Sequence, residues 1–541
     1  MEHKSTLEKR IFKASAFVLV AHLLFKFAGL IQAKVMGHYL PQTTFDVVYA
    51  FAFENCIFML FLIGEEVLGP AFLPVFMREL DIKSEKSAWS FANTVLSVQT
   101  ILLVLVAVAL CMVPEWITLA LTRWSPETAP DKFAMAAQSV RTMGPAVIGL
   151  SLGSISYVLL NSYKRFFLAA FGDAVWKFTV IAFLAASVLL ARDNAQMLMW
   201  GLVAGSLCKI GTHLFGLRDK LHYFRPSFAF SHPAFRQFCW LALPLIAGIL
   251  MAKVRDLVNN VYILSELEQS GLMQANSMGR KLQGTLLFLI PYTLSIAVFP
   301  FFCELVDKND HKKLGDLVTR FGRMLLSVFA PFALFVAVAA VPFTSLIFKG
   351  GYFDSVAVQR TAVSLAFYTF VLPAAAIEAL VMQAFFANRR MMAVTLIGIL
   401  FSAVSILISL LGLKMSGGNE LLVLAFIAGG FTLSRMFKCV TLVEMLKKNA
   451  PVFPFLETTA FLTRVGIAAG LASGAAWVLL YRVGAIAELS GRVGDMLKLC
   501  IAGAVFGVVY LGAAYGLHIG EVRELFVLVR DKVKSRRRSV A

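Results

Sequence analysis

Basic residues inside long apolar stretches are the residues of this chain best suited to bind a ligand. They are Lys26, Lys253, Arg255 and Arg280. A charge at the depth of a bilayer costs at least about 2.5–3.5 kcal/mol on insertion scales, so such residues usually face a bundle interior or a water-filled cavity. A cluster of these cations suits an anionic substrate, and arginine in particular binds phosphate through paired hydrogen bonds.

Some of these cations also have a simpler interpretation. Lys26 has no acidic neighbour three or four residues away, but its long side chain could extend to the membrane surface. Lys253 and Asp256 are spaced i,i+3 and could neutralise each other on one helix face, with Arg255 on another face. We nevertheless predict that all four cations bind the substrate.

Acidic residues in the same stretches are candidates for gating or coupling. Asp46 opens an apolar segment, where a carboxylate can also simply cap a helix and complement its dipole. We predict a gating or coupling role for Asp46 and for Glu65, although a structural role fits Glu65 equally well. Glu54 and Glu378 are further candidates for proton or ion sites.

The elements that position these residues follow from the composition. The chain has 541 residues, is 59% hydrophobic and only 15% charged, and has a mean hydropathy of +0.78. A soluble globular protein is typically about 45–50% apolar and about 25% charged. The sequence therefore predicts an all-α polytopic membrane protein.

Span length gives the number of helices. Because roughly 20 apolar residues cross the hydrocarbon core as a helix, we predict about 14 transmembrane helices. Their limits are 11–37, 46–74, 88–113, 139–162, 168–191, 196–216, 234–263, 271–303, 316–342, 356–387, 391–413, 420–446, 458–482 and 494–519. The connecting segments are too short for a soluble domain.

The loops alternate between rich and poor in lysine and arginine. This excess marks the cytoplasmic side of a membrane protein, so we predict that both termini are cytoplasmic. The same pattern accounts for the formal net charge of +18. We interpret the basic tail "RDKVKSRRRSVA" as solvated or in contact with anionic lipid, and predict no nucleic-acid partner.

Two pairs of motifs indicate an internal repeat. Ala-x-x-Pro-x-Phe ends the second and the eighth predicted spans, and Asn followed by a dibasic turn follows the fourth and the tenth. Pro74 and Pro300 are separated by nearly the same number of residues as Lys164 and Arg389. We predict two parallel six-helix lobes plus two C-terminal helices, with a substrate site near the midplane between the lobes. The predicted divisions are an N-terminal lobe over 1–225, a C-terminal lobe over 226–450, and the last two helices with the basic tail over 451–541.

The last two predicted spans are rich in G-x-x-x-G spacing. The glycines concerned are Gly466, Gly470, Gly474, Gly503, Gly507, Gly512 and Gly516. Such spacing allows helices to approach closely, which favours plain helix–helix packing. The alternative is a smooth groove for a lipid tail.

Sequence patterns of soluble enzymes are missing or misplaced. The chain has no G-x-x-x-x-G-K-[ST], no H-E-x-x-H and no C-x-x-C, so we predict no cofactor and no metal site. The stretch "GLSLG" (149–153) matches G-x-S-x-G, but a nucleophile elbow needs a strand–turn–helix context. The match lies inside a predicted span and is explained by helix packing, so we predict that the protein is not an enzyme.

Several longer segments together resemble the MviN/MurJ lipid II flippases of the multidrug/oligosaccharidyl-lipid/polysaccharide exporter superfamily, over most of the chain. They are "FDVVYAFAFENCIFMLFLIGEEVLGPAFLPVF" (45–76), "LLNSYKRFFLAAFGDAVWK" (159–177), "LPLIAGILMAKVRDLVNNVYI" (243–263), "ANSMGRKLQGTLLFLIPYTLSIAVFP" (275–300) and "LIFKGGYFDSVAVQRTA" (346–362). By this resemblance Lys26 and Arg280 stand at cavity arginine positions of the family, and Asp46 at its aspartate that starts the second span.

The chain also departs from the family pattern. Gln32 stands where a second arginine of the first span is usual, and Leu60 and Phe61 are apolar where members have an arginine pair. Asn259 stands where sodium-using members have an acid, so a sodium site is not expected. We hypothesise that Lys253 and Arg255 replace the missing positive charge.

The resemblance implies outward transport of the undecaprenyl-diphosphate-linked peptidoglycan precursor, lipid II, by alternating access in the bacterial cytoplasmic (inner) membrane. It implies a role in peptidoglycan biosynthesis and cell shape, a monomer in the lipid bilayer, and other cell-wall synthesis proteins as candidate partners. The nearest alternative is a flippase for another polyprenyl-diphosphate-linked oligosaccharide, such as an O-antigen unit. A multidrug antiporter should have an acidic cavity, a membrane-embedded glycosyltransferase should have a large extramembrane loop, and a scaffold without transport activity is the remaining alternative.

Overall fold

The computed structural model describes residues 27–287, 292–388 and 391–524, and the regular elements within them are helices. The chain divides into two compact units, Met1–Ser277 with Gly350–Phe353 (unit 1), and Met278–Lys349 with Asp354–Ala541 (unit 2). An isolated bridge between Gly350 and Phe353 closes the short segment that returns to unit 1. The predicted lobes over 1–225 and 226–450 divide the chain by sequence repeat rather than by packing, and stay a prediction.

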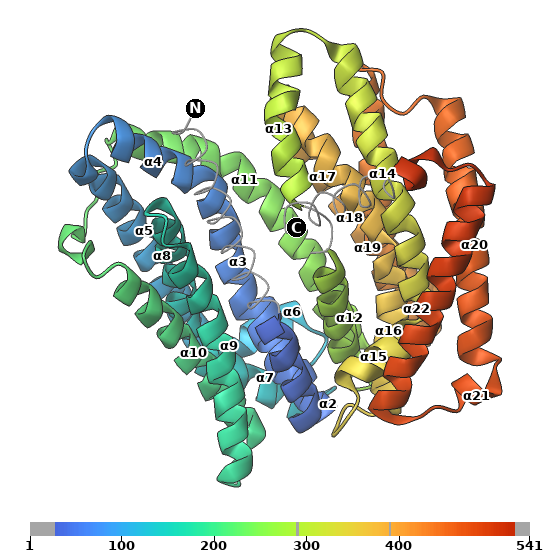
Figure 1. Ribbon diagram of the computed structural model, residues 1–541. Coiled ribbons are helices and arrows are strands. Elements are labelled where there is room, and N and C mark those ends of the chain that lie inside the picture. Colours follow the sequence, from blue (N-terminus) through green and yellow to red (C-terminus); the bar gives the residue numbers. More distant parts are fainter. Residues whose placement is uncertain (1–26, 288–291, 389–390, 525–541) are drawn as a thin grey trace, which may run out of the picture. The chain divides into compact units, whose positions relative to one another are not determined.

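Unit 1 contains a helix over 27–39 and the elements up to the start of α12 (Figure 1). These are α2 (Gln42–Thr44), η1 (Phe45–Ile57), α3 (Phe58–Val67), η2 (Leu68–Phe72), α4 (Leu73–Ile82), α5 (Glu85–Met112), α6 (Pro114–Leu121), α7 (Pro130–Met143), α8 (Ala146–Ser162), α9 (Phe166–Leu189), α10 (Asn194–Gly216), η3 (Leu221–Tyr223), α11 (Pro233–Leu257), η4 (Val258–Tyr262) and η5 (Leu264–Glu266). Helix α12 (Leu272–Leu287) begins in unit 1 and continues into unit 2.

Unit 2 contains the remaining helices, of which α20 and α22 run side by side (Figure 1). They are α13 (Tyr292–Asp307), α14 (His311–Val338), α15 (Ala340–Phe348), α16 (Ser355–Thr369), α17 (Val371–Ala387), α18 (Met391–Met415), α19 (Glu420–Lys447), α20 (Phe455–Tyr481), α21 (Gly484–Ala487) and α22 (Gly491–Gly516).

The all-α membrane class predicted from composition is confirmed. Among the described residues, 11 helical segments are long and apolar enough to cross a membrane, and α7 and α8, bent by 47°, make up to 12 if they cross as one. These correspond to 12 of the predicted spans. The other two, 11–37 and 271–303, include residues outside the described part of the chain, so the total of about 14 stays a prediction.

The second predicted span is one helical segment, Gln42–Ile82, with two π-helical stretches, η1 and η2. The η2 stretch contains Pro70 and is followed by Pro74 in α4. Because proline has no backbone N–H and its ring clashes with the preceding turn, the i→i−4 ladder is interrupted there. A π-helical stretch accommodates such an interruption without ending the helix.

Close helix packing in unit 1 depends on glycines. A Cβ atom on Gly149 would lie 2.7 Å from the Ser206 hydroxyl, and one on Gly153 would lie 2.9 Å from the side chain of Lys209. Both glycines come from the "GLSLG" stretch on α8, which therefore packs against α10. The predicted packing role of this stretch is confirmed.

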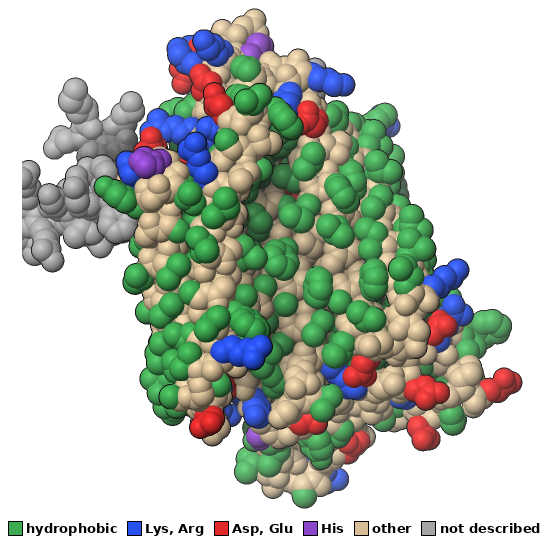
Figure 2. All heavy atoms as spheres, turned by 90° about the vertical axis from the view of Figure 1, so that its right-hand side faces the viewer, with side chains coloured by type: hydrophobic (Ala, Val, Ile, Leu, Met, Phe, Trp, Pro, Cys, Tyr) green, Lys and Arg blue, Asp and Glu red, His purple; other side chains and the backbone are tan. Residues whose placement is uncertain are grey.

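The glycines of α20 and α22 are different, and the prediction of plain packing is wrong for most of them. At Gly466, Gly470, Gly474, Gly507, Gly512 and Gly516 a Cβ atom would meet no heavy atom of the described residues within 4 Å. The two helices instead pack through residues such as Ala468, Ala472 and Ala502. Figure 2 shows this side of the molecule as a broad apolar surface with charged side chains gathered toward its ends. The glycine rows therefore leave open strips on α20 and α22 among the described residues.

The dibasic turn after α8 closes onto the end of α10. Both terminal nitrogens of Arg165 donate to the carboxylate of Asp219, each at 2.6 Å. This contact lowers the pKa of the Asp219 carboxyl to about 2 and raises the pKa of the Arg165 guanidinium. The matching turn of the second repeat includes Arg389 and Arg390, which lie outside the described residues.

The two kinds of glycine predict opposite effects of the same substitution. Gly205 on α10 is close-packed, since a Cβ atom there would lie 2.8 Å from the carbonyl oxygen of Trp176. Gly205→Ala should destabilise the protein by about 1–3 kcal/mol, the usual effect of overpacking. Gly470→Ala should leave stability unchanged or raise it by up to about 1 kcal/mol through helix propensity. Thermal unfolding of the detergent-solubilised variants measures both, and equal shifts would contradict the packing described here.

Candidate functional site

Arg280 lies on α12 in the part that belongs to unit 2. Its guanidinium carbon is 5.7 Å from the ring centroid of Phe431 on α19, within range of a cation–π interaction. The preceding residue, Gly279, allows α12 to pack closely against α16, since a Cβ atom there would lie 2.8 Å from the Cβ atom of Ser364. Lys26, the other predicted cavity cation, lies outside the described residues.

Sequence reasoning missed two further cations on α19, Arg435 and Lys438, of which Arg435 lies near the same Phe431 ring. Arg435 on α19 places its guanidinium carbon 6.0 Å from the centroid of the same Phe431 ring. Its Nε donates to Glu378 on α17 at 2.9 Å, and Lys438 contacts the other carboxylate oxygen of Glu378 at 2.7 Å. Charged residues inside the predicted span 420–446 were the signal that could have identified them.

Lys253 and Arg255 are both paired within unit 1. Lys253 forms an ion pair with Glu66 of α3, with an Nζ–Oε1 distance of 2.5 Å. Arg255 binds its neighbour Asp256 through Nε at 3.0 Å and Nη2 at 2.7 Å. The alternative pairing of Lys253 with Asp256 is therefore corrected, because a partner on another helix is available to Lys253. Substrate binding by Lys253 and Arg255 stays a prediction.

Asp46, which lies in η1, caps the start of α12. Its carboxylate accepts the backbone N–H groups of Gly271 at 2.6 Å and Gln274 at 2.7 Å, at the start of α12. Gly271 has a φ of +91° and no side chain, so the first turn of α12 takes its cap from η1 instead. Asp46 therefore holds the start of α12 from 225 residues away in sequence.

Two more polar contacts hold the first turns of α12 in unit 1. The Ser277 hydroxyl donates to Glu54 at 2.5 Å, and the side-chain amide of Asn276 donates to Asn260 at 2.9 Å. Glu54, a candidate proton or ion site, thus has a hydroxyl partner on α12.

Glu65 on α3 is half-buried beside a buried ionic network that sequence reasoning also missed. It interacts electrostatically with Lys209, Asp173, Glu66 and Lys253. Lys209, only 1% exposed, forms an ion pair with Asp173 at 2.6 Å. Asp173, and Lys209 with His213, lie within the predicted spans 168–191 and 196–216, where charge was the available signal.

This network also relates to one departure from the family pattern. The Nζ of Lys209 lies 4.5 Å from the ring centroid of Phe61, one of the apolar positions where members have arginine. His213, one turn further along α10, is fully buried between the Ser156 hydroxyl and the backbone oxygens of Gly153 and Ala169, each at 3.0 Å. A positive charge is therefore present near this position of α3, but it is supplied by α10 and neutralised by α9.

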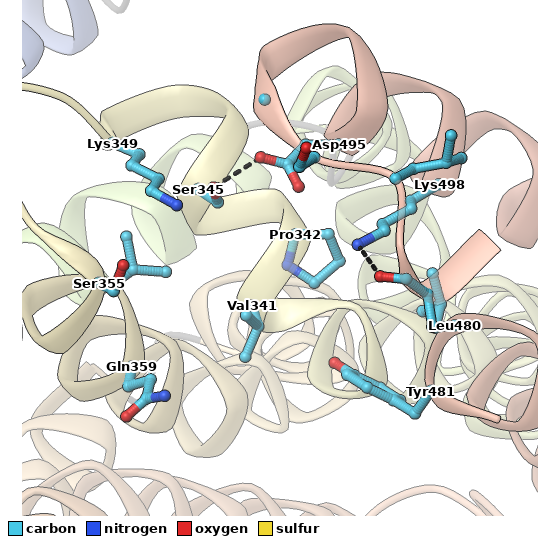
Figure 3. Close-up of a pocket in the computed structure, with 15 residues that line it drawn as sticks. Val341, Pro342, Ser345, Lys349, Ser355, Gln359, Leu480, Tyr481, Asp495 and Lys498 are labelled. Carbon is cyan, nitrogen blue, oxygen red and sulfur yellow. Dashed lines mark hydrogen bonds between the residues drawn. The ribbon is translucent and has the colours of Figure 1, made fainter. Parts of the chain in front are cut away.

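A pocket of about 380 Å³ opens in unit 2 between the α15–α16 region and the connection from α20 to α22 (Figure 3). The Ser345 hydroxyl donates to Asp495 at 2.6 Å on one side of it, and Lys498 donates to the carbonyl of Ala487 at 2.9 Å on the other. None of the predicted site residues is among those that line it. The pocket is therefore separate from the cations around Phe431.

The family model for lipid II flippase MurJ matches residues 32–488. The chain belongs to the MurJ family. This match covers most of the helices of both units, including Asp46, the ionic network of unit 1 and the cations around Phe431.

Relatives with the same description come from several bacteria. A probable lipid II flippase MurJ of Bdellovibrio bacteriovorus is 22% identical over 522 residues, covering 96% of this chain and 97% of the relative. One of Rhizobium meliloti is 22% identical over 479 residues, covering 86% of each chain. The lipid II flippase MurJ of Burkholderia cenocepacia is 24% identical over 368 residues, covering 66% of this chain and 70% of the relative.

Solved structures show the same fold. A lipid II flippase MurJ in an inward closed conformation has a TM-score of 0.70 at 16% identity, covering 92% of this chain and 99% of that one. An inward-facing multidrug resistance MATE family transporter of the MOP superfamily has a TM-score of 0.66 at 10% identity, covering 81% and 96%. This chain is thus a multi-pass helical membrane protein with a MurJ-like and MATE-like fold.

The cap that Asp46 provides can be tested directly. Asp46→Asn leaves one acceptor oxygen for two buried N–H groups, so the first turn of α12 should open more easily by about 1–3 kcal/mol. Hydrogen exchange of peptides covering 271–277 measures this change. Asp193→Asn is the matched control, because Asp193 caps α10 through one bond to Ala195 at 3.0 Å and asparagine caps equally well. Unchanged exchange in Asp46→Asn would contradict the role of Asp46 in holding α12.

Proposed function

We propose that this protein is a flippase for lipid II, moving the undecaprenyl-diphosphate-linked peptidoglycan precursor from the inner to the outer leaflet of the bacterial cytoplasmic membrane. The observation that carries the proposal is the match to the lipid II flippase MurJ family over residues 32–488. Cations inside membrane-spanning helices support it, because the substrate headgroup contains an anionic diphosphate. The process needs no covalent chemistry.

In this proposal the cations bind the diphosphate while the polyprenyl tail stays in lipid. Lys26 and Arg280 are the principal headgroup ligands, Lys253 and Arg255 contribute further positive charge, and Asp46 and Glu65 take part in gating or coupling. The open glycine strips of α20 and α22 provide a smooth surface along which a lipid chain can slide. Alternating access then exposes the headgroup first to the cytoplasm and next to the other side.

The membrane potential supplies a driving force for such a substrate. An inside-negative potential favours outward movement of an anion by about 2.3 kcal/mol per charge per 100 mV. This direction requires both termini in the cytoplasm, as the loop charges predict. The proposed working form is a monomer in the lipid bilayer, with other cell-wall synthesis proteins as candidate partners.

Complementation tests the substrate class. Expression of this chain should sustain growth and normal cell shape in bacteria depleted of their own lipid II flippase. A strain that lacks its O-antigen flippase is the control and should not be rescued. Rescue of the second strain without the first, at normal membrane abundance, would refute lipid II as the substrate.

Substitution of the two principal cations tests the proposed ligands. Lys26→Ala and Arg280→Ala should abolish complementation, because each removes a charge that binds the diphosphate. Lys26→Arg should retain more activity than Lys26→Ala, since it keeps the charge. Immunoblots of membrane fractions control for abundance. Full activity of both alanine variants would rule out a cationic headgroup site.

A further inference from the structure

Arg435, Lys438 and Glu378 form a charged cluster deep in the membrane-spanning part of unit 2. Phe431, Arg435 and Lys438 follow each other at i, i+4 and i+7 on α19 and so lie on one helix face. Arg435 is about 22 Å along α19 from its start at a rise of about 1.5 Å per residue. This depth is near the middle of a segment that is long and apolar enough to cross the membrane.

Glu378 binds only the Nε of the Arg435 guanidinium. The carboxylate is buried, with 4% of its side chain exposed, and each of its oxygens contacts a different cation. Arg435 uses its Nε for this contact, and its two terminal amino groups make no hydrogen bond to any described residue. The Arg435 side chain as a whole is 35% exposed. This is the arrangement that presents an arginine fork to an incoming anion.

The cluster has more positive than negative charge. Two cations share one carboxylate, which leaves a formal excess of one positive charge at a depth where an uncompensated charge is costly. Arg360 and Glu420, also on helices of unit 2, are an ion pair in which one cation faces one carboxylate. There Nε and Nη2 contact both carboxylate oxygens, at 2.9 and 2.6 Å. A purely structural role would be met by such a pair and does not call for the second cation.

Arg280 places a third cation near the Phe431 ring that Arg435 also approaches. The guanidinium carbons of Arg280 and Arg435 lie 5.7 and 6.0 Å from the centroid of the Phe431 ring. An anion with several oxygens can therefore be approached by groups from two helices, α12 and α19. A diphosphate has the charge and the number of acceptor oxygens for this arrangement.

We propose that Arg435 and Lys438, oriented by Glu378, form with Arg280 a binding site for the diphosphate of the lipid substrate in unit 2. This inference rests on the proposed flippase function and adds two ligands to it. Glu378 is a positioning residue, because its carboxylate holds the two cations and does not itself contact the anion.

The test measures binding of two lipids to the full-length protein in nanodiscs, by native mass spectrometry. Undecaprenyl diphosphate carries the anion, and undecaprenol is the matched probe without it. The double variant Glu378→Gln/Arg435→Gln removes one cation together with the shared carboxylate, so the net charge of the cluster stays the same although Lys438 loses its ion-pair partner. Its affinity for undecaprenyl diphosphate should fall about tenfold, the effect of losing a charge-assisted hydrogen bond, with undecaprenol unaffected.

Two further variants keep the test decisive if the double variant does not fold. Lys438→Gln leaves a one-to-one pair of Arg435 and Glu378, and should also bind the diphosphate lipid several-fold more weakly. Arg360→Gln is the control for a structural ion pair; it should lower thermal stability without changing the affinity of the folded protein for either lipid.

The outcomes separate this inference from the function itself. Wild-type affinity for undecaprenyl diphosphate in both Lys438→Gln and the double variant, with binding lost in Arg280→Ala, would overturn the role of Arg435 and Lys438 alone. Equal weakening for undecaprenol would also overturn it, since the effect would not depend on the anion. Failure of the unsubstituted protein to bind lipid II would refute the proposed function, and this inference with it.

Discussion

Charge inside hydrocarbon must find a partner, and this constraint decides which helices of the protein lie together. A single buried charge left unpaired costs several kcal/mol, far more than an exposed ion pair contributes. The membrane-spanning helices are accordingly joined by ion pairs between residues far apart in sequence. They are Lys209–Asp173 between α10 and α9, Lys253–Glu66 between α11 and α3, Arg360–Glu420 between α16 and α19, and Glu378 of α17 with Arg435 and Lys438 of α19.

These ion pairs differ in whether their charges balance. Lys209 and Asp173 neutralise each other and are nearly inaccessible, so the pair fixes α9 against α10 and exerts little field on its surroundings. The group around Glu378 has one more cation than carboxylate, and the Arg435 side chain in it is partly exposed. In a protein that must attract an anion and then release it, the balanced pairs suit the scaffold and the unbalanced group suits the ligand site. This distinction depends on counting partners in space, because each residue alone is simply a charge in an apolar run.

Sequence reasoning reached the fold class and the approximate limits of the spans, because 20-residue apolar runs leave few alternatives in a membrane. It identified Arg280 and Asp46 as residues of interest for the same reason. It did not identify their partners. Asp46 accepts a hydrogen bond from Gly271, 225 residues away in sequence. Lys253 forms its ion pair with Glu66 on another helix and not with its near neighbour Asp256. Local spacing predicts pairs within one helix, whereas the pairing here depends on which helices pack together.

The glycines also show that local spacing does not predict which helices pack together. G-x-x-x-G spacing occurs in α20 and α22, where most of the glycines meet no other described residue, while glycines that are close-packed, such as Gly149 and Gly205, lie in α8 and α10. The spacing reports only that one helix face is flat. Whether another helix or a lipid chain covers that face depends on the neighbouring residues, and here alanines already provide the contact between α20 and α22.

The start of α12 shows how a constraint on the backbone is met from a distance. The first N–H groups of a helix have no partner within the helix, and Gly271, with a φ of +91°, has no side chain that could accept them. The carboxylate of Asp46 accepts the N–H groups of Gly271 and Gln274 from 225 and 228 residues away in sequence. A carboxylate in an apolar segment and a helix start without a local cap therefore satisfy each other, and neither could be assigned its partner from local sequence alone.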